Sequence, residues 1–258
     1  MSGTMTTPAS RMAALARAEL TLFGRNRGTL VAALLVPLIL PFSVYSFTTD
    51  MDLDQVGFTP GALILPAAVG FALLFAVYSA LVAVYTSRRE ELVLKRLRTG
   101  ELRDHEILAG SALPAAATGL GQSVLLVTGC AVLLDMPAPR APHLAVLGLL
   151  LGLVMCAALA ACTSAFTRTV EAAQVTTLPV VMVSLLGSGM TFPLQMLPDT
   201  AASVCELLPL TPVITLVRGG WTGDLTASET VSALIVALAW TAGGVFAVRR
   251  WFRWEPRR

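Results

Sequence analysis

Two groups of side chains have types and spacings that could bind a metal ion, but neither set is complete. Glu101 and His105 are four residues apart, as two ligands on one helical face would be, yet Gly100 disfavours a helix there and no third ligand follows. Three aspartates, Asp50, Asp52 and Asp54, begin like a calcium-binding loop. The sixth and twelfth positions of that loop lack the required glycine and glutamate. We therefore expect solvated loop charges and no metal site.

Covalent chemistry and nucleotide binding have equally little support. Ser188, within Gly187–Gly189, is the one serine whose glycine flanks suggest a nucleophile. A nucleophile needs a base within reach, and both histidines, His105 and His143, fall at the ends of apolar segments rather than beside it. No G-x-x-x-x-G-K-[ST] phosphate loop occurs. We expect no catalytic residue and no ATP site of the usual kind in this chain.

One stretch carries an unusual density of charge. The segment RREELVLKRLRTGEL, Arg88–Leu102, has eight charged residues in fifteen, although only 13% of the chain is charged. Leucines alternate with the charges up to Arg98, and Thr99–Gly100 then favours a break. This pattern predicts a short helix that lies along the membrane surface. A solvated loop that only anchors the topology is the alternative.

The rest of the sequence is that of a membrane protein. The chain is 55% hydrophobic with a mean hydropathy of +0.75, and six runs without Asp, Glu, Lys or Arg are each long enough to cross a bilayer as a helix. We predict an all-α polytopic membrane protein with residues 1–258 as one transmembrane domain. Ion-coupled transporters place ionisable residues inside their spans, so either the energy for transport comes from outside this chain or the protein is a passive pore or scaffold. The runs are Leu30–Phe47, Gly61–Ser87, Ile107–Leu134, Leu144–Thr167, Ala172–Pro198 and Thr230–Val248.

Two further segments are apolar but are not expected to span the membrane. Residues 11–27 place apolar side chains on one arc of a helical wheel and arginines opposite, which predicts an interfacial amphipathic helix. Residues 193–218 are interrupted by four prolines, which prevent a continuous helix. We predict a re-entrant segment of two short helices that forms an external lid. Its prolines are Pro193, Pro198, Pro209 and Pro212.

The basic residues predict the orientation. With six spans, sixteen of the 18 Lys and Arg residues fall on one side of the membrane, and only Arg140 and Arg218 fall on the other. The positive-inside rule then places both termini and Arg88–Leu102 in the cytoplasm. The abundance of arginine and alanine suggests a GC-rich bacterium, and therefore its inner (plasma) membrane. The net charge of +2 implies no nucleic-acid partner.

Two motifs together resemble the permease subunits of type 2 ABC exporters. The first is RREELVLKRLRTGELRDHEILAG, from Arg88 to Gly110, which is similar to that family's cytoplasmic loop. The second, SGMTFPLQMLPDTAASVCELLPLTPVITLVRG, from Ser188 to Gly219, is similar to the family's signature between the last two spans. The family usually has Gly-Thr where this chain has Leu92–Val93, and Pro where it has Gly100.

This resemblance implies a half-transporter powered by other subunits. Two permease subunits, identical or different, would pair in the membrane, and two nucleotide-binding ATPase subunits, which would bind ATP and magnesium, would dock beneath them. An ATPase-coupling helix would seat in a cleft of each ATPase, and Leu94 and Leu97 would anchor it there. The expected coupling residues are Arg88, Arg89, Glu90, Glu91, Leu94, Lys95, Arg96, Leu97 and Arg98.

The resemblance also implies a substrate path. The second and fifth spans would face the partner subunit, and each carries large apolar residues at helical spacing. Met and aromatic side chains suit varied lipophilic ligands, so we expect a drug, an antibiotic or another lipophilic molecule. A non-transport scaffold, a membrane enzyme, or a permease for polysaccharide or lipid-linked substrates are the alternatives. The path residues are Phe71, Phe75, Tyr78, Met182, Leu186, Met190 and Phe192.

Overall fold

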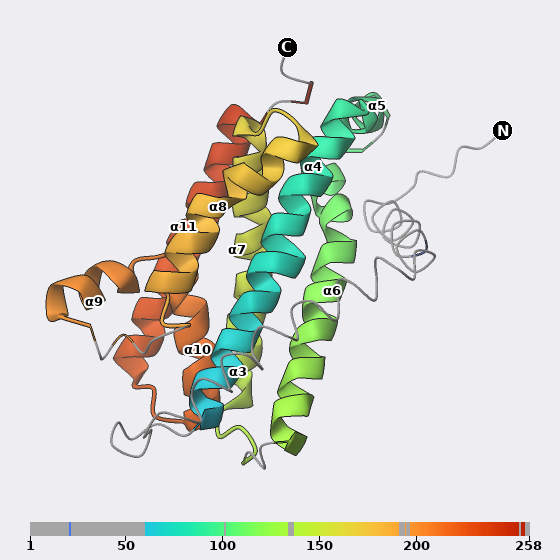
Figure 1. Cartoon of the computed structure of the whole chain (residues 1–258). Coiled ribbons are helices and arrows are strands. Elements are labelled where there is room, and N and C mark those ends of the chain that lie inside the picture. The colour runs from blue at the N-terminus through green and yellow to red at the C-terminus, as the bar shows by residue number, and fades with distance from the viewer. Residues whose placement is uncertain are drawn as a thin grey trace, which may run out of the picture.

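The described part of the chain is a bundle of helices. The computed structural model describes Thr21 and residues 60–100, 102–133, 137–190, 194, 197–252 and 254–255. No β-strand occurs among these residues. The elements, which Figure 1 shows, are α3 (Pro60–Phe71), the π-helix η2 (Ala72–Ser79), α4 (Ala80–Glu90), α5 (Val93–Arg98), α6 (Asp104–Leu133), α7 (Pro142–Phe166), α8 (Val170–Gly187), α9 (Asp199–Glu206), α10 (Thr211–Thr222) and α11 (Ala227–Trp251).

Five helices of the described residues are long and apolar enough to cross a membrane: Ile64–Glu90, Asp104–Val132, Pro142–Phe166, Val170–Gly187 and Ala227–Trp251. They coincide with five of the six predicted spans, so the chain is a multi-pass membrane protein. The remaining predicted span, Leu30–Phe47, and the predicted interfacial helix, residues 11–27, lie outside the described residues.

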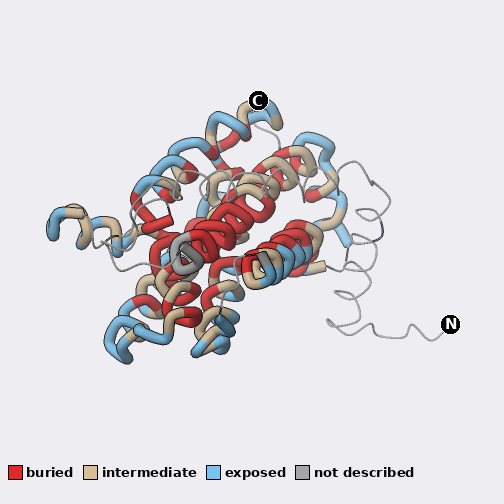
Figure 2. The backbone as a smooth tube through the Cα atoms, turned by 60° about the horizontal axis from the view of Figure 1, so that its bottom comes forward, coloured by how far each residue is buried: buried red, intermediate tan, exposed pale blue. Residues whose placement is uncertain are grey.

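The first of these five helices is the centre of the bundle. It runs through α3, η2 and α4 without a break in the chain. Most residues of its apolar stretch are buried within the bundle. Figure 2 shows this buried run surrounded by helices whose outer sides are exposed. The other helices pack around it because nearly every side of it is apolar. The π-helical stretch was not predicted, and its sequence carries no breaker that would have indicated it.

Helix α10 packs closely against α7. Gly148 and Gly152 of α7 face Val213 and Leu216 of α10, and a Cβ added at Gly152 would lie 2.9 Å from a Val213 methyl carbon. Small residues four apart let two helices approach closely in a membrane. Every residue of α10 from Thr211 to Ile214 is buried as a result.

The segment predicted to be re-entrant does form two short helices. Helices α9 and α10 meet at an angle of 97°. Pro198 directly precedes α9, Pro209 lies in the break, and Pro212 occupies the first turn of α10, where its missing N–H has no partner to lose. Pro193 lies outside the described residues. Helix α9 buries none of its side chains and projects from the bundle (Figure 1).

Candidate functional site: the α5 surface and the faces around it

The charged segment forms a short helix at one end of the bundle, as predicted. Helix α5 follows α4 after a two-residue turn and precedes α6, and the C-terminal end of α11 lies at the same end of the molecule (Figure 1). The turn that joins α7 to α8 also lies there, because Arg89 at the end of α4 reaches it.

The turn into α5 has an unusual backbone. Leu92 has φ 60° and ψ 13°, the left-handed conformation, which costs a non-glycine residue about 1–2 kcal/mol. Glycine adopts it without that cost. The left-handed turn thus gives a physical reason for the glycine that type 2 permeases usually have at this position, where this chain has leucine.

The paired arginines at the end of α4 point into their own bundle. Arg89 is 1% exposed and donates hydrogen bonds from its two terminal nitrogens to the carbonyl oxygens of Ser164 (2.7 Å) and Thr167. These carbonyls belong to the last turn of α7, where a helix has no donors of its own. Arg88 donates to Ser111 Oγ of α6 at 2.9 Å. Both arginines were predicted to contact an ATPase. Instead, their hydrogen bonds join the end of α4, just before α5, to α6 and α7.

Helix α5 presents one side to the bundle and the others to solvent. Leu94 is fully buried within this chain, so it is not available to anchor an ATPase as predicted. Leu97 is half-buried, whereas Lys95, Arg96 and Arg98 are exposed. We call the exposed residues Glu90, Glu91, Lys95, Arg96 and Arg98 the α5 surface.

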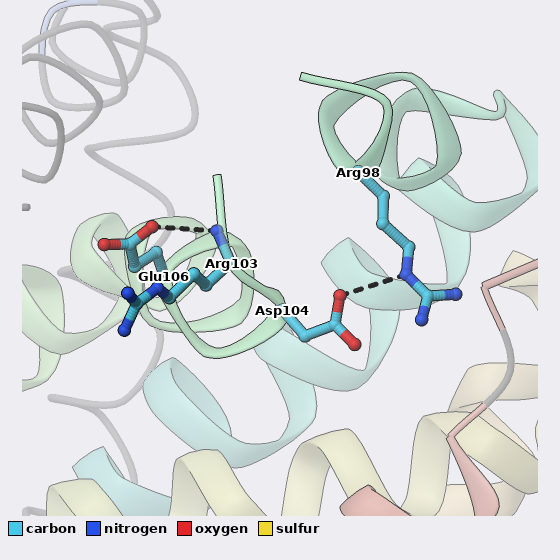
Figure 3. Close-up of polar contacts among 4 residues, drawn as sticks. All are labelled: Arg98, Arg103, Asp104 and Glu106. Atoms are coloured by element: carbon cyan, nitrogen blue, oxygen red, sulfur yellow. Dashed lines mark hydrogen bonds and ion pairs between the residues drawn. The ribbon is translucent and has the colours of Figure 1, made fainter. Parts of the chain in front are cut away.

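The residues that hold α5 in place come partly from α6. Arg98 Nε lies 3.0 Å from the Asp104 carboxylate, and the Arg103 backbone N–H donates to the Glu106 carboxylate at 2.8 Å (Figure 3). Glu106 thus caps the first turn of α6, where a negative charge is favourable. The contact between Asp104 and Arg98 was not predicted, although an acidic residue at the start of a predicted helix is a recognisable signal.

The predicted path residues separate into two groups. Tyr78 is 1% exposed and its hydroxyl lies 3.0 Å from Thr163 Oγ1 of α7, and Phe71 and Met190 are also buried. Such side chains pack inside the chain and do not face a partner in this conformation. Met182 and Leu186 of α8 are 46% and 69% exposed. Phe75 is half-buried and stacks on Phe71, with ring centroids 6.2 Å apart, while Phe192 lies outside the described residues.

The two ends of the second motif meet in space. Arg218 of α10 donates to the carbonyl oxygen of Gly189 at 2.6 Å. Gly189 has φ 70° just beyond the end of α8, a position that favours glycine. This hydrogen bond joins the end of α8 to α10, so part of the motif stabilises the packing of these two helices.

Neither a metal centre nor a disulfide is found in the described residues. No group of three or more His, Cys, Asp or Glu side chains lies close enough there to hold a metal ion. Glu101 lies outside them, so the suggested Glu101–His105 pair is not described. All four cysteines are free.

Comparison with known proteins identifies the family. A search of curated proteins returned no match. The family model for the ABC-2 type transporter matches residues 11–221, which include both motifs and most of the helices described above. The chain therefore belongs to the ABC-2 type transporter family and is a permease subunit of an ABC transporter, whose family members work with ATPase subunits.

Proposed function

We propose that this chain is the permease subunit of a bacterial ATP-driven exporter for a lipophilic molecule such as a drug or antibiotic. Two permease subunits pair in the inner (plasma) membrane with both termini in the cytoplasm. Two separate ATPase subunits bind ATP and magnesium and dock at the α5 surface. The family match is the observation that supports the transport role. The exposed charges of α5, at the end of the bundle where the C-terminal end of α11 also lies, support the docking position.

The contacts of α4 and α5 suggest how closure of the ATPases reaches the membrane. Arg88 bonds to α6 and Arg89 to α7, so a displacement of α5 is passed to two spans at once. Leu94 holds α5 on the bundle, so the short helix cannot move independently of α4 and α6. Packed elements of this kind change between discrete arrangements rather than deforming gradually.

The ATPase recognises α5 chiefly through Arg96 and Glu90. Both are exposed, whereas Arg98 already pairs with Asp104 and Glu91 accepts a hydrogen bond from Ser87 Oγ at 2.8 Å. We expect Arg96→Ala or Glu90→Ala to weaken binding of the ATPase at least tenfold, because losing one partner of a charge pair in an interface costs about 2–5 kcal/mol. Folding should be unaffected. Binding of the purified ATPase subunit to the chain in lipid nanodiscs measures the change.

Arg140→Ala is the matched control for Arg96→Ala. It removes the same charge from an exposed arginine near Gly223, away from α5, so it should bind the ATPase as the wild type does. Equal affinity for the wild type, Arg96→Ala and Glu90→Ala would refute docking on the α5 surface.

The substrate path is proposed along the exposed face of α8. Val175, Leu178, Met182 and Leu186 are exposed there at helical spacing, and none is needed to fill the interior of this chain. In a paired transporter such a face contacts the second permease, and its apolar side chains would line the path. The buried residues Phe71, Tyr78 and Met190 would support it from behind.

Leu186→Ala should reorder the preference among transported compounds without lowering stability. The side chain is 69% exposed, so its removal opens no cavity in the chain. A few methylene groups in a binding pocket change discrimination by about tenfold or more. Stimulation of ATP hydrolysis by a panel of lipophilic compounds measures this. Phe246→Ala, an equally exposed position on α11, is the control; a uniform change for all compounds would show that Leu186 is not in the path.

A further inference from the structure

The chain beyond α11 returns to α5. Phe252 packs against the core of the bundle, and its N–H donates to the Val248 carbonyl at 2.9 Å. Trp254 then stands edge-on to Phe252, with ring centroids 5.1 Å apart. Trp254 and Glu255 each contact a basic side chain of α5. The tail is therefore anchored at one end in the bundle and at the other on the short helix.

Both contacts fall on the same side of α5. Lys95 Nζ lies 2.7 Å from a Glu255 carboxylate oxygen, and the Arg98 guanidinium lies 5.0 Å from the centroid of the Trp254 ring system. Lys95 and Arg98 are three residues apart, so they share one flank of the helix. Leu94 faces the bundle, and a rotation of about 100° per residue directs Arg96 away from both Leu94 and the tail.

Helix α5 needs such support because it cannot be stable alone. It has six residues, its N-cap is the left-handed Leu92, and no side chain caps its N-terminus. Isolated helices shorter than about 12 residues are marginal in water. Leu94 is the one buried residue of α5, so the ion pairs and the stacked tryptophan provide much of what remains to order it.

We propose that Phe252, Trp254 and Glu255 form a strap that holds α5 in its docking conformation and is thereby part of the ATPase-binding surface. This inference rests on the proposed function. The strap contacts the flank formed by Lys95 and Arg98, two residues of the α5 surface, and leaves Arg96 and Glu90 exposed. It therefore orders the helix while the two residues proposed to recognise the ATPase stay accessible. The partner is the ATPase subunit, which meets a helix that is already ordered.

The strap can be tested without any ATPase. In the full chain in nanodiscs, Trp254→Ala combined with Glu255→Gln should raise the hydrogen-exchange rate of the α5 backbone amides, residues 94–98, several-fold, because cation–π and ion-pair contacts at partly exposed sites are each worth a small factor. A chain that ends at Glu255 is the control, since it loses the arginines at 257 and 258 but keeps both contacts. Unchanged exchange in the double variant would overturn the proposal.

Binding of the ATPase gives the second readout. The double variant should bind the ATPase subunit about three- to tenfold more weakly than the wild type, because part of the binding energy then orders α5. Wild-type affinity or tighter binding would overturn the strap, the latter showing that the tail competes with the ATPase. If the ATPase fails to bind the wild type, the proposed function is wrong, and the exchange measurement still decides whether the tail orders α5.

Discussion

Arg89→Ala should lower the free energy of unfolding by about 3 kcal/mol or more, although its charge lies in a segment expected to serve only docking. The side chain is 1% exposed and donates to the carbonyls of Ser164 and Thr167. Hydrogen bonds from a charged donor are worth about 1.5–3 kcal/mol each, and without them the end of α7 loses its partners. Thermal unfolding in detergent, followed by size-exclusion chromatography, measures the loss.

Two further variants separate this packing role from loss of charge. Arg96→Ala removes the same charge from an exposed position on α5 and should unfold at the same temperature as the wild type. Arg89→Lys should be intermediate, because an ammonium group lacks the planar fork that reaches two carbonyls. If Arg89→Ala unfolds at the same temperature as Arg96→Ala, then Arg89 does not stabilise the end of α7, and its docking role must be reconsidered.

The second large effect is expected at Gly220. A Cβ at this position of α10 would lie 2.5 Å from the backbone nitrogen of Ala145 and 3.0 Å from the Ala141 carbonyl oxygen. Backbone atoms cannot move aside as a flexible side chain can, so Gly220→Ala should push α10 away from α7. Overpacking of this kind costs about 1–3 kcal/mol, and the folded yield should fall accordingly.

Gly243→Ala is the matched control. Gly243 lies in α11, and no atom would come within 4 Å of a Cβ there. The same substitution should therefore be neutral or slightly stabilising, because alanine has the higher helix propensity. Equal stability of the two variants would mean that α10 does not pack against α7 as described.

The sequence predicted most of the described fold because long uncharged runs have few alternatives in a bilayer. Five predicted spans coincide with helices to within a few residues at most of their ends, and the prolines correctly predicted the break between α9 and α10. Burial within the bundle was harder to predict. Periodicity placed Phe71 and Tyr78 on one face, but it cannot say whether that face meets lipid, a partner subunit or the chain's own helices.

At the candidate site, too, the position of the helix could be predicted but the burial of its residues could not. Charge density located α5, yet it could not distinguish Arg89, which is buried, from Arg96, which is exposed. That difference depends on which side of α4 meets the end of α7, and so on contacts between residues about 75 apart in the chain. The contact of Glu255 with Lys95 is equally non-local, so only the fold could show it.

The central claim is that the ATPase docks on α5, and the position of contact tests it most directly. A photo-reactive residue is placed at position 99, the C-cap of α5, in one variant, and at position 224, between α10 and α11 at the opposite end of the bundle, in another. Both positions are exposed and neither is proposed to bind the ATPase, so neither substitution should disturb the fold or the docking. Docking on α5 predicts that position 99 crosslinks to the ATPase subunit and position 224 does not. A crosslink from position 224, with none from position 99, would contradict it.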